Sequence, residues 1–235
     1  GIETNCDYVT AILAGEVCQQ GRLLTRSLSE FTYRANTVQV LQAGTQTTLQ
    51  DYPGRTGLWN VGVPPSGPMD SLSSRLANRL LGNDEDAATL EITLNGPTLL
   101  FNSDCQLCIV GAAIELWIDD EPALMNGVLS LKAGQQLRLG KVTNGARSYL
   151  AVAGGFQCPL YLGSRSTFTL GQFGGHAGRA LRVGDVLRLS DRGDDSGPAL
   201  STSALPATML PPVSDEWTLR VIYGPHGAPD FFTDN

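Results

Sequence analysis

Hydrophobic and polar positions alternate in short runs along most of the chain, which predicts β-strands. Turn residues separate these runs, for example Asn95-Gly96-Pro97 and Asn144-Gly145. Short strands at such close spacing are typical of an antiparallel barrel or sandwich. The predicted strands are 38–41, 47–50, 89–93, 98–101, 105–110, 114–118, 128–131, 136–139, 147–151, 186–189 and 217–223. We expect the first two to pair as a hairpin across Gly44.

One segment of the strand-rich region has helical periodicity instead. Leucines and alanines between Leu72 and Leu81 recur at three- and four-residue spacing and share one face. Asp70 or Ser71 can cap the start, and Gly82-Asn83 ends the pattern. The sequence therefore predicts one well-defined helix over 72–81.

Residues 1–30 also read as helical, because apolar residues between Tyr8 and Val17 recur at helical spacing after a possible cap at Thr4 or Asn5. A second short helix is expected from Leu23 to Leu28. This unit has too little apolar surface to form a core alone. The predicted fold class is mainly β, antiparallel and barrel-like, with one well-defined helix, preceded by a short helical tail.

The predicted organisation has four parts. Residues 1–36 form the helical tail, and residues 37–190 form the β-rich unit. Residues 191–213 are rich in Ser, Pro and Gly, which is typical of a linker or loop excursion. Residues 214–235 contain one more predicted strand and begin a second unit. The chain starts with Gly1, and we expect it to be an excerpt of a longer polypeptide.

The stretch from Gln50 to Asp70 is too rich in Gly and Pro for a regular helix or strand. Long irregular loops inside compact domains are uncommon unless they are functional or disordered. Trp59, Val61 and Val63 argue against disorder, because such residues favour burial. We therefore expect an ordered loop that forms part of a site.

Composition excludes several classes of partner. A net charge of −7 disfavours binding to nucleic acid or to an anionic membrane. No apolar run approaches the roughly 20 residues of a membrane-spanning helix. Five cysteines form neither an even set nor a disulfide scaffold, which favours a reducing, intracellular setting, and we expect a cytoplasmic location.

The residue types that often carry metal or base chemistry are sparse. Cys105 and Cys108 lie three apart on a predicted strand, so their thiols point to opposite faces, and we expect core residues rather than metal ligands. His176 lies in a Gly-rich loop and is expected to make a loop contact. His226 is similar. Gly171-Gln172-Phe173-Gly174-Gly175 is not framed by a strand and a helix and does not read as a dinucleotide site.

One set of polar residues is more informative: Asp51, Arg55, Ser66, Asp70, Glu91, Asn95, Arg165 and Arg179. Glu91 and Asn95 are an even number of steps apart and should share one face of a strand. Two interpretations stay open. Either Glu91 or Asp70 pairs with Arg55 or Arg165 to hold the irregular loops, or the set surrounds a small polar ligand.

Two stretches of the chain resemble known families. Residues 1–8, Gly-Ile-Glu-Thr-Asn-Cys-Asp-Tyr, are similar to a segment in the last helical part of biotin carboxylase domains. Residues 38–235 resemble the allophanate-hydrolase-subunit-2-like, or biotin-dependent carboxyltransferase, domain. The matching stretches are 50–55, 62–70, 77–83, 91–97, 153–155 and 161–167. This order of the two units resembles the urea carboxylase family, including the urea carboxylase part of urea amidolyases.

The resemblance implies a biotin-dependent ligase in which ATP, Mg²⁺ and bicarbonate carboxylate biotin on one domain. A carrier then brings carboxybiotin to the carboxyltransferase, where the carboxyl group passes to urea and forms allophanate. Arg55 and Arg165 would bind the carboxylate or the ureido oxygen, and Asp70, Glu91 and Asn95 would orient urea. The ATP-binding loops and the biotinylated Lys are expected in other domains of the same polypeptide, which we expect to be a homo-oligomer.

Two alternatives remain at this stage. The carboxyltransferase-like unit also resembles 5-oxoprolinase-type subunits, which act with a partner chain. The same scaffold could also serve a non-catalytic, protein-binding regulator. Neither alternative would carry residues 1–30. As an excerpt of a urea carboxylase, the 235-residue chain alone is expected to be inactive.

Overall fold

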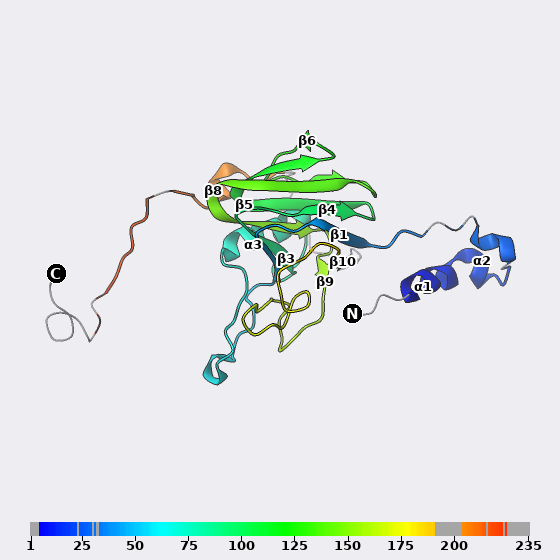
Figure 1. Cartoon of the computed structure of the whole chain (residues 1–235), viewed down its shortest axis with the longest axis horizontal. Coiled ribbons are helices and arrows are strands. Elements are labelled where there is room, and N and C mark those ends of the chain that lie inside the picture. Colours follow the sequence, from blue (N-terminus) through cyan, green and yellow to red (C-terminus); the bar gives the residue numbers. More distant parts are fainter. Residues whose placement is uncertain are drawn as a thin grey trace.

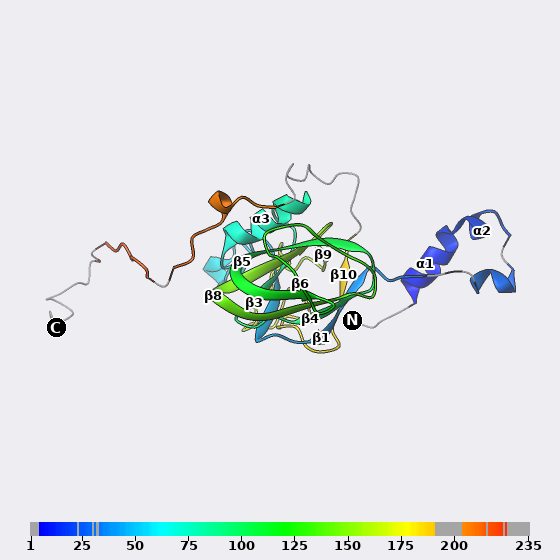
Figure 2. The same cartoon turned by 90° about the horizontal axis from the view of Figure 1, so that it is seen from above.

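The computed structural model describes residues 5–22, 24–29, 31, 33–190, 204–214, 216–222 and 224. Ten antiparallel strands form one curved sheet, with helix α3 against its outer face (Figures 1 and 2). The strands are β1 (Thr37–Gln42), β2 (Gln46–Gln50), β3 (Thr89–Thr93), β4 (Thr98–Phe101), β5 (Cys105–Ile118), β6 (Glu121–Pro122), β7 (Leu129–Leu131), β8 (Gln136–Val152), β9 (Phe156–Gln157) and β10 (Val186–Leu189). The helices are α1 (Cys6–Ala14), α2 (Glu16–Gln19), α3 (Ser71–Leu81) and the 3₁₀ turns η1 (Thr25–Leu28), η2 (Trp59–Val61) and η3 (Ala207–Met209).

Strand β8 organises the sheet. Its first part pairs with β4 and its last part with β3, while β5 runs along nearly its whole length. The order through the main path is β2-β3-β8-β4-β1-β10-β9. The β5–β8 register shifts near Gly111, which has φ 115° and where a Cβ would lie 2.7 Å from the Arg147 carbonyl oxygen. Such irregularities bend a sheet, so the strands curl into a half-barrel, and the predicted barrel-like fold is confirmed.

The two faces of the sheet carry two hydrophobic cores. Because side chains alternate along a strand, Leu150 and Val152 of β8 point into the larger core, whereas Ala151 points to the opposite face. That opposite face packs against α3 and against Leu205. The predicted core thiols follow the same rule, since Cys105 contacts the larger core and Cys108 the smaller one. Burial raises the pKa of both thiols to about 12.

Helix α3 confirms the sequence prediction in its ends and its buried face. The Asp70 side chain accepts a hydrogen bond from the Ser73 amide at 3.0 Å, and Gly82 ends the helix with φ 75°. Ala77, Leu80 and Leu81 are buried against the sheet. The carboxylate cap and the left-handed glycine satisfy the backbone groups that a helix leaves unpaired at its ends.

Several strand predictions were wrong in pairing or extent. The predicted hairpin of 38–41 with 47–50 does not form, because β1 pairs with β4 and β10 while β2 pairs with β3. The predicted strands 105–110 and 114–118 are one strand, β5, and 136–139 and 147–151 are one strand, β8. Residues that often form turns also occur inside β5 and β8. They remain part of these strands because β5 and β8 pair with each other over most of their length.

The chain ends also differ from expectation. The described part of the predicted strand 217–223 is extended without a sheet partner, and Trp217, Leu219 and Val221 are exposed. The N-terminal helix stops at Ala14, because Gly15 is extended, and α1 buries no residue, as its small apolar surface suggested. No helix among the described residues combines the length and apolar character needed to cross a membrane.

Candidate functional site

Two irregular segments project from the same end of the sheet and lie against each other, at the bottom of Figure 1. The first follows β2 and the second follows β9. We call residues 50–70 together with residues 161–179 the loop platform. The expectation of an ordered loop is confirmed, since side chains from the end of β2 bind both segments. The reason given for order was partly wrong, because Trp59 and Val61 at the tip are 73% and 67% exposed.

Asp51 is the main anchor of the second segment. Its Oδ2 accepts a hydrogen bond from the Arg165 amide at 2.7 Å. Its Oδ1 accepts from the hydroxyls of Ser164 and Ser166 at 2.5 and 2.6 Å. The residue is 5% exposed, so three donors replace the water that its carboxylate loses. Asp51 therefore fixes the backbone on both sides of Arg165.

Arg55 is a buried part of the loop platform and is 1% exposed. Its Nε donates to the Tyr161 carbonyl and its Nη2 to the Ser166 carbonyl, each at 2.9 Å. Its guanidinium carbon lies 4.9 Å from the centre of the Phe173 ring. Burial lowers the pKa of Arg55, and the nearby Asp51 carboxylate opposes that shift. Arg55 thus binds the protein's own backbone with one edge of its planar group, while Nη1 has no hydrogen-bond partner among the described residues.

Gln50 joins the two segments of the loop platform. Its Oε1 accepts from the Gly67 amide at 3.0 Å, and its Nε2 donates to the Thr167 carbonyl at 3.2 Å. Gln50 is 6% exposed and comes from the last position of β2. A buried amide that is bonded at both ends fixes the separation of the segments it joins.

Glu91 holds the end of the first segment, at the start of α3. Its Oε2 accepts from the Met69 amide and from the Tyr149 hydroxyl, each at 2.8 Å. Its Oε1 lies 3.4 Å from Arg147 Nε, as an ion pair without hydrogen-bond geometry. The Tyr149 hydroxyl in turn accepts from the Asp70 amide at 2.7 Å. Burial raises the pKa of Tyr149, and the Glu91 charge adds to that shift.

The acidic residues that were expected to orient urea are therefore engaged within the protein. Both oxygens of Asp70 accept from Ser73, one from its amide and one from its hydroxyl. Both oxygens of Glu91 face donors of its own fold. The expected pairing of these acids with Arg55 or Arg165 does not occur, because Glu91 pairs with Arg147 and Asp70 with the helix start.

Arg165 differs from Arg55 in burial and in contacts. Its backbone is held by Asp51, but its guanidinium has no hydrogen bond or ion pair to any described residue. The side chain is half-buried, and its neighbours Ser164 and Ser166 are fully buried. Among the predicted site residues, Arg165 is the one whose charged group remains available on the loop platform.

Asn95 lies away from this platform. The prediction that it shares a strand face with Glu91 was wrong, because β3 ends at Thr93 and Leu94 has φ 61°. The Asn95 Nδ2 donates to Thr45 Oγ1 in the turn before β2, at 3.1 Å. Asn95 therefore lies beyond the end of β3 that is opposite to Gln50 and Asp51, which at about 3.4 Å per residue is on the order of 20 Å away.

Arg179, another member of the predicted set, has structural contacts, and for Ser66 the structure shows an unusual backbone angle. Arg179 donates to both oxygens of Asp185, at 2.7 and 2.8 Å, and His176 Nε2 lies 3.4 Å from the same carboxylate. Arg179 and the Arg182 amide lower the pKa of Asp185 to about 2. Ser66 has φ 56°, in the left-handed region. The His176 contact agrees with the expected loop role.

Sequence reasoning missed residues whose role depends on pairing across the sheet. They are Gln50, Ser164, Ser166, Arg147 and Tyr149. The two serines lay inside the stretch 161–167 that resembles the carboxyltransferase family, which was a usable signal. Tyr149 and Arg147 had no signal, because only the β3–β8 register brings them beside Glu91.

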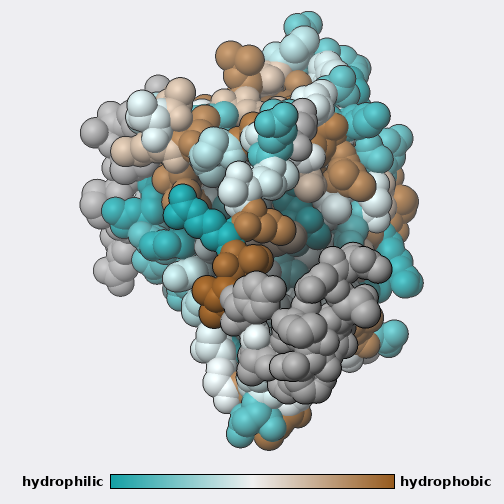
Figure 3. Space-filling model, turned by 90° about the vertical axis from the view of Figure 1, so that its left-hand side faces the viewer, coloured by the Kyte–Doolittle hydropathy of each residue, from teal (hydrophilic) through white to brown (hydrophobic). Residues whose placement is uncertain are grey.

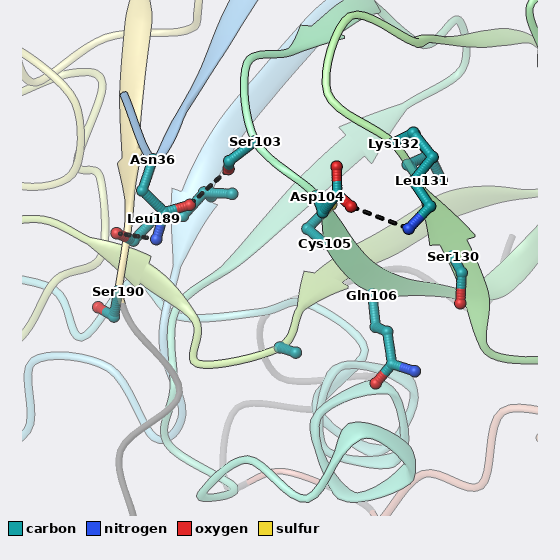
Figure 4. A pocket seen from close by; sticks show the side chains of 11 residues that line it. Asn36, Ser103, Asp104, Cys105, Gln106, Ser130, Leu131, Lys132, Leu189 and Ser190 are labelled. Carbon is teal, nitrogen blue, oxygen red and sulfur yellow. Dashed lines mark hydrogen bonds and ion pairs between the residues drawn. The ribbon is translucent and has the colours of Figure 1, made fainter. Parts of the chain in front are cut away.

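Away from the platform, a hollow with a volume of about 610 Å³ lies between the ends of β10, β5 and β7. Figure 4 shows that its charged pair, Asp104 and Lys132, is bonded together, as are Asn36 and Ser103. Lys132 Nζ binds Asp104 Oδ2 at 2.9 Å, and Ser103 Oγ donates to Asn36 Oδ1 at 2.6 Å. Because the charged groups of this hollow are paired, the loop platform is the stronger candidate.

Exposed hydrophobic side chains accompany the platform. On it or beside it, Trp59, Met69, Leu160 and Leu162 are between 52% and 74% exposed. On the face that Figure 3 shows, hydrophobic side chains also lie in separate groups among hydrophilic ones. Large exposed apolar groups around a polar site are typical of a surface that another protein segment covers.

Comparison with known proteins agrees with this geometry. A family model described as the carboxyltransferase domain, subdomain A and B, matches residues 61–235. Urea amidolyase of Lachancea kluyveri is 45% identical over 238 residues, which cover 99% of this chain and 13% of that protein. The crystal structure of Kluyveromyces lactis urea carboxylase has a TM-score of 0.82 and 44% identity, over 91% of this chain and 19% of that one.

A third relative is named for a different activity. A 5-oxoprolinase subunit of Escherichia coli is 41% identical over 159 residues, which cover 68% of this chain and 51% of that protein. The chain thus spans about an eighth of the urea amidolyase and about half of the 5-oxoprolinase subunit. The family model matches most of the chain, and the fold agrees with a solved relative. The chain therefore belongs to the carboxyltransferase domain family, in the form found in urea carboxylases and urea amidolyases.

Proposed function

We propose that this chain is part of a biotin-dependent urea carboxylase and forms one wall of the site where a carboxyl group passes to urea. The proposal includes the division predicted from the sequence, with residues 1–36 as the tail of a biotin carboxylase unit and residues 214–235 as the start of a second carboxyltransferase subdomain. The ATP- and Mg²⁺-dependent step and the biotinylated carrier belong to other domains of the same polypeptide, which we propose is cytoplasmic and a homo-oligomer.

The observation that carries the proposal is the guanidinium of Arg165, which has no hydrogen bond or ion pair to any described residue and projects from an ordered platform. A planar guanidinium matches a carboxylate or a ureido oxygen, because its N–H groups form a fork. Rigid donors stabilise developing charge without reorganising during the reaction. The backbone around Arg165 is held by the buried Asp51, and the adjoining segment by Arg55. Carboxybiotin, when bound, supplies the carboxyl group that Arg165 would hold.

The remaining residues of the platform support this role without touching substrate. Asp70 and Glu91 fix the loop at the start of α3. The exposed hydrophobic groups such as Trp59 and Leu162 would exclude water once another part of the protein covers them. Exclusion of water matters, because it strengthens the contact of Arg165 with a carboxylate and suppresses hydrolysis of a reactive carboxyl donor.

The test uses Arg165→Ala in the full-length polypeptide that carries this chain. Urea-dependent ATP turnover should fall by about 100-fold, as for removal of one charge-stabilising donor. Biotin-dependent ATP cleavage without urea should persist. Arg182→Ala is a matched control, since that side chain is exposed and only the backbone of Arg182 makes hydrogen bonds to described residues.

Two results would contradict the proposal. Full urea turnover in Arg165→Ala would remove Arg165 from the site. Turnover with 5-oxoproline and none with urea would assign the chain to the activity named for the Escherichia coli relative, which is the alternative that the 41% identity supports.

A further inference from the structure

We propose that Asp51 is a positioning residue that sets the direction of the Arg165 guanidinium. The inference rests on the proposed function, in which Arg165 binds the transferable carboxylate. Asp51 does not touch substrate in this account. It acts through three hydrogen bonds to residues 164–166.

The contacts give Asp51 unusual control over a short segment. The carboxylate takes the Arg165 amide on Oδ2 and the hydroxyls of Ser164 and Ser166 on Oδ1. The Asp51 amide also donates to Ser166 Oγ at 3.0 Å. Ser164 and Ser166 are both 0% exposed. The residues before and after Arg165 are therefore buried and bonded, whereas Arg165 between them is only half-buried.

The buried charge of Asp51 is compensated within the platform. Arg55 is close enough for its pKa to be influenced by Asp51, and its Nη2 binds the Ser166 carbonyl. The Asp51 carboxylate thus binds the N–H and O–H donors of this segment. The Arg55 guanidinium binds its carbonyl acceptors. This arrangement fixes the orientation of the peptide planes next to Arg165, and with it the direction of the Cα–Cβ bond.

The substitution Asp51→Asn tests the inference with little change of shape. An amide offers one acceptor oxygen in place of two, whereas three donors point at the carboxylate. We expect the Arg165 amide of the 235-residue chain to exchange its hydrogen about tenfold faster or more. The Thr167 amide is an internal reference, because it donates to the Leu49 carbonyl and not to Asp51. Ser164→Ala, which keeps the charge, should give a smaller change in the same direction.

The functional arm is a double-mutant cycle in the full-length polypeptide, measured as kcat/KM for urea. Asp51→Asn should lower kcat/KM by about tenfold or more when Arg165 is present. It should have no further effect in the Arg165→Ala background. A purely structural role would lower thermal stability in both backgrounds and would reduce kcat/KM by the same factor in both.

The outcomes separate this inference from the proposed function. Unchanged exchange at the Arg165 amide in Asp51→Asn would overturn the inference whatever the enzyme does. An equal loss of kcat/KM in both backgrounds would also overturn it. Normal urea turnover in Arg165→Ala alone would instead refute the proposed function, while the exchange measurement would still decide whether Asp51 holds Arg165 in place.

Discussion

Replacing Arg55 by Ala should destabilise the protein far more than replacing Arg165 by Ala. Arg55→Ala removes two hydrogen bonds from a charged group to the carbonyls of Tyr161 and Ser166, each worth about 1.5–3 kcal/mol. It also removes the contact with Phe173, worth about 0.5–2 kcal/mol, and a cation whose charge interacts with that of Asp51.

Two terms oppose this loss. The buried guanidinium already carries a desolvation cost, as its lowered pKa indicates, and its Nη1 has no partner among the described residues. Removing a group of this kind relieves both. Breaking a buried pair by deleting one partner typically costs about 3–5 kcal/mol. We therefore expect a loss of about 3 kcal/mol, which for a chain of this size lowers Tm by roughly 6–12 °C.

Differential scanning calorimetry of the 235-residue chain provides the measurement. Thermal unfolding is preferable to unfolding by urea, because urea is also the proposed substrate. Arg165→Ala is the matched control, since its guanidinium has no hydrogen bond or ion pair to a described residue, and its Tm should change by less than about 2 °C. Arg55→Lys should fall between the two, because an ammonium keeps the charge but cannot bind both carbonyls in a fork. If Arg55→Ala lowers Tm by less than about 2 °C, the role assigned to Arg55 is refuted.

Two further predictions concern single polar contacts. Arg179 lowers the pKa of Asp185 from 3.8 to about 2. The ionised carboxylate therefore stabilises the folded state by about 2 kcal/mol above pH 4. This stabilisation is lost as the pH falls from about 4 to 2. Asp185→Asn should lower Tm at pH 7 and flatten the dependence of Tm on pH in that interval, and an unchanged acid profile would contradict this. Tyr149→Phe leaves Glu91 one donor short and should cost about 1–3 kcal/mol by calorimetry. Tyr33→Phe is its control, because it keeps the ring contact with Tyr8 and should leave Tm unchanged.

The sequence pattern was sufficient to predict those elements that are stabilised by residues close together in the sequence. Helix α3 was predicted to within one residue, because its cap at Asp70, its apolar face and its terminal glycine are neighbours in the sequence. The mainly β class followed from alternation and turn residues. The stretch 50–70 was correctly predicted to be an ordered loop, although two of the apolar residues used for that prediction, Trp59 and Val61, are exposed.

Pairing between distant segments was not available from the sequence. The predicted hairpin failed, because β1 buries its Val38 and Val40 by pairing with β4 and β10 rather than with its neighbour β2. The alternation of hydrophobic and polar residues specifies which face of the sheet a residue occupies. It does not specify which strand is the pairing partner. The exposure of Trp59 was missed for a related reason, since an apolar residue at a loop tip is buried only if some other segment reaches it.

The sequence by itself determined which residues could carry a carboxyltransferase site, since charged groups in Gly-rich loops of a recognisable order are a local property. Only the tertiary structure decided which contacts each one makes. Arg55 and Arg165 look equivalent in the sequence, yet Arg55 is buried against carbonyl groups 106 and 111 residues away, whereas the Arg165 guanidinium bonds to no residue that the structure describes. Hydrogen bonding across such separations depends on how the sheet curves, and no local pattern encodes that curvature.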